Sequence, residues 1–346
     1  MQLVIPALLQ TNALLDNLGE PRLPALDLML TRGRLEHSAP ASLDEWLCQK
    51  FDISQQRDTP IAAICLAMDG TDPGQEYWLR ADPVHIRIAR DQLILNEITD
   101  LTGEEASQLA RTLAEHFGDD FSPVILKSGA WVMSATHHAN MATTPLSRAI
   151  GQHIDPLLPR GTDAMHWKKL LNEIQMLLFD HPVNQAREAK GLPTANSVWL
   201  WGGGKLPTKP DHASPHVLMT KHTLAQTLAK FAQATLHPMQ AAWTPELMAN
   251  LLIFDAPQAA LQRGDLTAWL DAMKALEQHW LKPLLDNQPR FTLYDPTQGT
   301  CLHWKSSDRW KLWRRPQKPQ RQTFGFATTN TDASAVSNVD EFGNRF

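Results

Sequence analysis

Apolar positions recur at two spacings along this chain, and the alternation predicts a protein built from both strands and helices. Runs of consecutive apolar residues at 3–6, 61–68 and 197–201 are typical of strands that are buried on both faces. Further strands are expected within residues 77–95, 121–134 and 290–305. The first 75 residues or so then form the order strand, helix, helix, strand, which is how an α/β fold begins.

Helical spacing is clearest at residues 102–117, where the apolar side chains share one face. Thr102 and Glu105 form a capping box at its start. Another helix is expected to begin at Pro245, with Thr244 as its cap. With that one included, apolar residues three and four apart predict helices at 23–34, 42–51, 163–181, 222–235, 245–252 and 265–285.

The pattern changes at Tyr77 and again near residue 197, which suggests that one domain is inserted into another. We expect a core made of residues 1–77 and 197–315, with an inserted α+β domain at 78–196. Residues 316–346 lack a periodic apolar face and are predicted to be a flexible tail.

Composition excludes several classes of protein. The 346 residues are 43% hydrophobic and 20% charged, with a net charge of −5, so the chain is globular and lacks the positive excess of a general nucleic-acid binder. The three cysteines are too far apart for a disulfide framework or a CxxC metal site. No apolar stretch reaches the ~18 residues of a membrane span. We therefore expect a cytoplasmic protein without a membrane partner, for which nucleic acid is not the default partner.

Three consecutive glycines, Gly202, Gly203 and Gly204, follow the strand that is predicted at 197–201. Glycines let backbone N–H groups approach an anion closely, so a ligand-facing loop is one interpretation. The other is a structural turn at the end of a strand, because the spacing matches neither the phosphate loop nor the dinucleotide fingerprint.

Candidate anion ligands lie in two further segments. Arg80 lies in a predicted strand, and His181, Asn184 and Arg187 lie in the segment HPVNQAREAKG. An arginine fork suits phosphate or carboxylate, so these residues could form an anion clamp. Alternatively, Asn184 caps a helix and the arginines pair with acids. A zinc site is the less favoured interpretation of four residues around a proline, Asp211, His212, His216 and His222.

Tryptophans are concentrated late in the chain. Trp269 and Trp280 are expected to pack in the core, because they share a face of a predicted helix. The basic segment at 305–321 contains Trp310 and Trp313 and suits either an anionic partner or a solvated edge.

A family resemblance rests on residues 181–204, HPVNQAREAKGLPTANSVWLWGGG. This segment resembles the archaeal-type cofactor-independent phosphoglycerate mutases, and LPALDLMLTRG resembles a helix of the same alkaline phosphatase superfamily. With weaker similarity, the resemblance extends over residues 3–290 and is nearest to bacterial regulatory proteins of the RpfE type. It implies an α/β fold with a reduced alkaline-phosphatase-like core and the inserted α+β domain.

The resemblance also implies phosphoryl transfer by two divalent metals, held by Asp and His, and a serine nucleophile. This chain departs from that pattern. The first strand reads VIPALL with no acid before Asp16, and Leu261, Gln262 and Arg263 stand where a histidine ligand is expected. No serine in the first seventy residues has a recognisable nucleophile context. We therefore expect no metal, no cofactor and no identifiable catalytic residue.

The candidate anion-binding residues match the family pattern better than the metal-binding residues do. Arg80, His181, Asn184, Arg187 and the glycine turn are expected to form an anion pocket between the two domains. The favoured hypothesis is a regulatory protein that binds a phosphorylated metabolite or a protein partner. An active mutase or phosphatase, with metals held by Asp69, Asp72, Asp255 or the cluster at 211–222, is an alternative. An interaction protein that uses the Trp-rich basic segment is the other.

Overall fold

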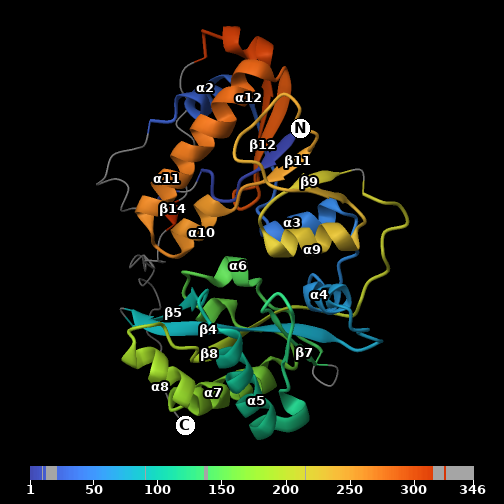
Figure 1. Cartoon of the computed structure of the whole chain (residues 1–346), viewed down its shortest axis with the longest axis vertical. Coiled ribbons are helices and arrows are strands. Elements are labelled where there is room, and N and C mark those ends of the chain that lie inside the picture. Colours follow the sequence, from blue (N-terminus) through green and yellow to red (C-terminus); the bar gives the residue numbers. More distant parts are fainter. Residues whose placement is uncertain are drawn as a thin grey trace, which may run out of the picture.

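The computed structural model describes residues 1–9, 11–12, 22–89, 91–135, 139–214, 216–314 and 323–324. Two sheets, one above the other in Figure 1, organise these residues, and helices cover both of them. The α/β class is therefore confirmed. The flexible tail predicted at 316–346 lies outside the described residues, apart from the short strand at 323–324.

The first sheet has seven strands in the order β10-β9-β11-β1-β12-β13-β3. Strands β1, β9, β10, β11 and β12 run parallel to one another. Near one edge, β13 runs antiparallel to both of its neighbours, β12 and the edge strand β3. The bounds are β1 Gln2–Val4, β3 Arg34–His37, β9 Val217–Met219, β10 Thr235–His237, β11 Leu251–Ile253, β12 Arg290–Asp295 and β13 Thr300–Lys305. A separate parallel pair joins β2 Thr11–Asn12 to β14 Thr323–Phe324.

Successive residues of β1 point to opposite faces of this sheet and enter two different hydrophobic cores. Leu3 and Ile5 pack in the core formed with α2 Pro24–Arg32 and α11 Leu266–Leu276, whereas Val4 packs in the core formed with α3 Leu43–Lys50 and α9 Thr223–Phe231. The helix predicted at 265–285 is present as α11, a π-helical turn η4 Glu277–Leu281 and α12 Lys282–Asn287. The remaining helices of this part are α10 Ala256–Gln262 and η5 Ser306–Trp310.

The second sheet is antiparallel and contains β4 Trp78–Ala89, β5 Gln92–Glu97, β6 Val124–Ile125, β7 Trp131–Ser134 and β8 Ser197–Gly204. Its outer face is covered by α5 Gly103–Phe117, α7 Ala164–Phe179 and α8 Pro182–Ala189 (Figure 1). The capping box of Thr102 and Glu105 at the start of α5 is confirmed. Shorter elements are α6 Leu146–Ala149, η1 Gly118–Asp120 and η3 Asp155–Leu157.

Three expectations about this architecture were wrong. Residues 61–68 form a helix, α4 Ile61–Asp69, because an apolar run of this length suits a helix buried all round as well as a strand. The helix expected at 245–252 does not form, since Leu251–Ile253 pairs as β11 between β9 and β1. Strand β8 was assigned to the core, but it pairs with β4 in the second sheet. The other predicted domain boundaries stay predictions.

Candidate functional site

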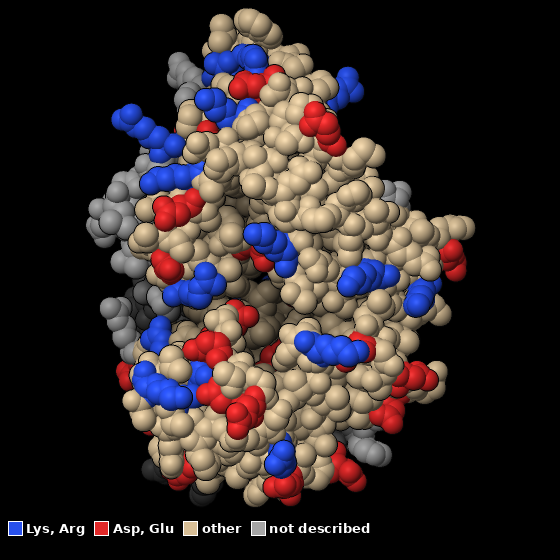
Figure 2. Space-filling view, in the orientation of Figure 1, with Lys and Arg blue, Asp and Glu red and all other residues tan. Residues whose placement is uncertain are grey.

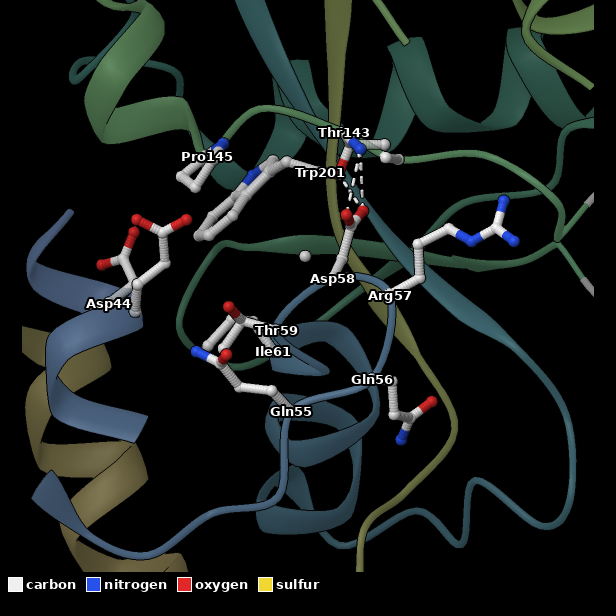
Figure 3. Close-up of a pocket in the computed structure, with 13 residues that line it drawn as sticks. Asp44, Gln55, Gln56, Arg57, Asp58, Thr59, Ile61, Thr143, Pro145 and Trp201 are labelled. Carbon is white, nitrogen blue, oxygen red and sulfur yellow. Dashed lines mark hydrogen bonds between the residues drawn. The ribbon is translucent and has the colours of Figure 1, made fainter. Parts of the chain in front are cut away.

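A cavity of about 270 Å³, here called the central cavity, lies between helix α3, which packs under the first sheet, and the second sheet. One wall is the start of α3 and the loop at 55–61, and the other is the loop at 142–145 with the end of β8 (Figure 3). Figure 2 shows acidic and basic side chains interspersed on this face of the molecule, around a hollow near its middle. The cavity is therefore the natural candidate for a binding site.

Asp44 stands in the first turn of α3, where a capping box of Ser42 and Glu45 fixes the start of the helix. Its side chain is buried, and Oδ2 accepts a hydrogen bond of 3.0 Å from the Ser147 hydroxyl on the opposite wall. Burial raises the pKa of Asp44, although the charge of His222 and the hydrogen bond from Ser147 act in the opposite direction. This contact ties the two parts of the molecule together.

Asp58 closes the cavity on the other side. Both of its carboxylate oxygens accept hydrogen bonds from the Thr143 backbone N–H, at 3.1 and 2.9 Å, and the Thr143 hydroxyl also donates to Oδ2. Burial raises the pKa of Asp58, and the hydrogen bonds from Thr143 lower it less. Beside it, Arg57 donates to the side-chain oxygen of Asn140. The charged groups of this wall therefore already have partners within the chain.

Arg80 lies beneath the cavity in a buried network. Its guanidinium pairs with Asp82 at 2.6 Å and stacks over the ring of Trp201, with 5.0 Å to the ring centre. The Trp201 indole N–H donates to the other oxygen of Asp82 at 2.7 Å, and the Trp131 backbone N–H donates to Asp82 at 3.3 Å. Asp82 therefore neutralises Arg80, and the predicted role of Arg80 as a free anion ligand has no support in this arrangement.

The glycines at the end of β8 allow this strand to approach its neighbours closely. Gly202 has a φ of +64°, and a Cβ at this position would lie 2.9 Å from the Cβ of Ile61 in α4. A Cβ on Gly203 would lie 2.3 Å from the Tyr77 hydroxyl. Gly202 lines the central cavity, whereas Gly203 and Gly204 do not. The three glycines are part of strand β8, which pairs with β4 as far as Gly204, so they form neither the predicted turn nor a ligand-facing loop, and close packing explains them.

His181, Asn184 and Arg187 lie on α8, and none of them lines the central cavity. His181 is the N-cap, since its Nδ1 accepts from the Val183 N–H, so the expectation that Asn184 caps the helix was wrong. Asn184 instead bonds the backbone of Leu178 and Ala195.

Arg187 is 1% exposed, and it pairs with acids, as the alternative interpretation proposed. It donates to Pro193 O at 2.7 Å, pairs with Asp100 at 2.5 Å and pairs with Glu105 at 3.1 Å. Arg80 therefore lies beside strand β8 with its glycines, whereas His181, Asn184 and Arg187 lie away from it, and the predicted anion pocket does not form from these residues. No ligand can reach Arg187 in this conformation.

The residues present do not fit a pair of divalent metals. Over the described ranges, no group of three or more His, Cys, Asp or Glu side chains lies close enough to hold a metal ion. Three of the candidate ligands have other roles: His222 caps α9 through Nδ1, Asp69 accepts from the Lys127 N–H, and Asp72 accepts from the Gly74 N–H. Where a histidine ligand was expected, Gln262 donates to the Ser147 carbonyl at 2.6 Å.

Sequence reasoning missed the acids of the central cavity. Asp44 lies in the first turn of a helix, where acidic residues are common, and Asp58 precedes the apolar run at 61–68 that was predicted to be a strand. The available signal was the capping box at Ser42, which places Asp44 one residue from Glu45 in the same first turn. The pairing of these acids with residues 143 and 147 depends on long-range packing and has no local signal.

Comparisons with known proteins give a consistent result. The 2,3-bisphosphoglycerate-independent phosphoglycerate mutase of Methanosarcina mazei is 33% identical over 207 residues, which are 54% of this chain and 49% of that protein. The probable enzyme of the same name from Geobacter sulfurreducens is 29% identical over 202 residues, which are 54% of this chain and 50% of that protein. The chain therefore matches only about half the length of these relatives. The Methanothrix thermoacetophila mutase is 33% identical over 111 residues, 28% of its length.

Two solved structures match more of the chain than these relatives do, but at lower sequence identity. The PH0037 protein of Pyrococcus horikoshii covers 92% of this chain at 15% identity with a TM-score of 0.46, and 89% of that protein is matched. The cofactor-independent phosphoglycerate mutase of Thermoplasma acidophilum covers 88% at 14% identity with a TM-score of 0.35, and 89% of it is matched. No protein-family model matches the chain.

Within the described ranges, every helix is too short or too polar to cross a lipid bilayer. The RpfE-type subgroup stays a prediction. The sequence similarities support a relationship: over about half of its length, this chain is similar to the 2,3-bisphosphoglycerate-independent phosphoglycerate mutases.

Proposed function

We propose that this chain is a phosphoglycerate mutase-like regulatory protein that works by binding at the central cavity and does not transfer phosphoryl groups. The observation that carries the proposal is the hydrogen bonding of three acids at or beneath the central cavity. Asp44, Asp58 and Asp82 each accept hydrogen bonds from donors of the same chain. In this arrangement the acids hold the cavity together.

A metal ion would have to displace these donors. Both oxygens of Asp58 accept from Thr143, so coordination would leave a partly buried N–H without an acceptor. The cavity is therefore better suited to hydrogen bonding than to metal-assisted catalysis.

The charge of the central cavity bears on the choice of ligand. Its wall holds three acids, Asp44, Glu45 and Asp58, against one cation, Arg57. A phosphorylated metabolite would meet like charge there, whereas a protein partner can bring N–H donors to the remaining lone pairs of these carboxylates. Of the two ligands expected from the sequence, we therefore propose the protein partner for this cavity.

Retention of metal tests the proposal. The full-length protein should be incubated with excess Mn²⁺ or Zn²⁺, dialysed and measured by elemental analysis, beside the Methanosarcina mazei relative treated identically. We expect well under one equivalent per chain. Two equivalents that survive dialysis would overturn the proposal and would restore the active mutase or phosphatase as the leading hypothesis.

One observation favours a second candidate, an interaction protein that uses the Trp-rich basic segment. Trp310 and Trp313 are 72% and 77% exposed, and Leu312 between them is also exposed. Exposed large apolar side chains beside basic residues are typical of a contact surface for an anionic partner. Retention on immobilised heparin that falls in a W310S/W313S variant would support this candidate, and equal retention would contradict it.

A further inference from the structure

A second cavity, of about 360 Å³, lies at the carboxyl ends of β9 and β11 in the first sheet and is here called the edge cavity. Its walls are mainly apolar and include Ile253, Phe254, Leu276 and Trp280. Three titratable side chains also line it, Lys221, Asp255 and His279. No residue is shared with the central cavity, so this is a separate site.

The sheet brings the charged residues to one edge. Strands β9 and β11 are parallel neighbours, with Leu252 in register with Met219. Lys221 and Asp255 each follow the end of their strand by two residues, so both emerge at the same carboxyl edge. Ligands of open α/β sheets bind at this edge, where neighbouring loops leave a crevice.

The π-helical turn η4 shapes the opposite wall. Glu277 in this turn accepts the first N–H groups of α2, from Ala25 at 2.6 Å and Leu26 at 3.2 Å, which holds η4 in place. Trp280 then packs edge to face against Phe254, with 4.8 Å between ring centres. A π-turn inside a helix is often found at a functional site, and here it fixes an aromatic wall beside the cavity.

The charged side chains of the edge cavity have no partners within the described residues, unlike those of the central cavity. Asp255 begins α10 without capping it. In the part of the chain that the structure describes, no hydrogen bond or ion pair engages the side chains of Lys221, Asp255 or His279. Lys221 and Asp255 therefore line the same apolar cavity without forming an ion pair with each other.

We infer that the edge cavity binds a small zwitterion with an apolar side chain, of the kind represented by an apolar α-amino acid. Its carboxylate would pair with Lys221, its ammonium group with Asp255, and its apolar body would cover Phe254 and Trp280. A cavity of about 360 Å³ falls within the ~300–1,000 Å³ of small-molecule sites. Lys221 is exposed and Asp255 is half-buried, and a zwitterion offers an opposite charge to each of them, whereas a singly charged ligand offers one to only one of them.

Calorimetric titration of the full-length protein tests the inference with three matched probes. L-Phenylalanine carries both charges, 3-phenylpropionate lacks the ammonium group, and phenethylamine lacks the carboxylate. We expect saturable binding of L-phenylalanine and at least tenfold weaker binding of both analogues. Lys221→Met and Asp255→Asn should each weaken the binding of L-phenylalanine at least tenfold.

Two substitutions on α11 serve as matched controls. Lys274→Met and Asp271→Asn remove the same charges from exposed positions that do not line the cavity, and they should leave binding unchanged. Equal thermal melting of all variants would show that they fold. No binding of L-phenylalanine or L-leucine at millimolar concentration would overturn the inference. Equal affinity for a singly charged analogue, or binding that survives both cavity substitutions, would also overturn it. None of these results depends on metal retention, so the proposed function is tested separately.

Discussion

Arg187 offers the sharpest test of whether the mutase-like segment at 181–204 is structural or binds a ligand. As an anion ligand, Arg187 would be dispensable for folding. In the structure it joins the start of α5 to the end of α8, through Glu105, Asp100 and the carbonyl of Pro193. The substitution Arg187→Met keeps most of the buried volume and removes every one of these hydrogen bonds.

The expected loss follows from the exposure of each partner. Glu105 is 20% exposed, so its charge-assisted bond at 3.1 Å contributes about 1.5–3 kcal/mol. Asp100 is 47% exposed, and solvent screening reduces its share to about 0–1 kcal/mol. The bond to Pro193 adds about 1 kcal/mol. We therefore expect Arg187→Met to lower the free energy of unfolding by about 2.5–5 kcal/mol.

Urea unfolding followed by circular dichroism measures this loss. Arg111→Met is the matched control, because Arg111 is an exposed arginine on the neighbouring helix α5; it should change stability by less than ~0.5 kcal/mol. If Arg187→Met also costs less than 1 kcal/mol, Arg187 does not hold α5 to α8 and the structural assignment is refuted.

Three further predictions follow from other contacts. Gly203→Ala should destabilise the fold by about 1–3 kcal/mol in thermal melting, because its Cβ would meet Tyr77, whereas Gly103→Ala, with no atom within 4 Å, should not. Asp82→Asn should cost about 3–5 kcal/mol, because it leaves the buried Arg80 charge without a counterion; a loss as small as that of a surface substitution would contradict the network. Burial raises the pKa of Glu105, but hydrogen bonds from Thr102 and the charge of Arg187 outweigh it, so the folded pKa lies below 4.5. This stabilisation is present above pH 4.5 and is lost as the pH falls through the folded pKa, so the stability difference between parent and Arg187→Met should shrink in acid, and a constant difference would contradict the pairing.

Local signals predicted the helices well. The capping boxes at Ser42 and Thr102 fixed where α3 and α5 begin, because the bonds involved join residues only three apart. The apolar run at 61–68 did not predict its helix, because its apolar residues are continuous and show no helical spacing. A helix wedged between α9 and the second sheet is buried all round, and its residues are as uniformly apolar as those of a central strand.

The candidate site was harder to predict because its geometry depends on contacts between distant residues. The sequence identified Arg80 and Arg187 as candidate ligands, but it did not show that Asp82 pairs with Arg80 and that Asp100 pairs with Arg187. A buried arginine and a ligand-binding arginine look the same until the acid beside it is known. The partnership of Asp44 with Ser147 spans 103 positions, and no pattern along the chain indicates it.

The central claim, that this mutase relative binds without transferring phosphoryl groups, is tested most directly by following 3-phosphoglycerate by phosphorus NMR with the full-length protein and added Mn²⁺. The Methanosarcina mazei relative serves as the positive control in the same buffer. We predict that the 3-phosphoglycerate signal stays unchanged over hours at micromolar protein. Conversion to 2-phosphoglycerate that is proportional to protein concentration and abolished by EDTA would contradict the account.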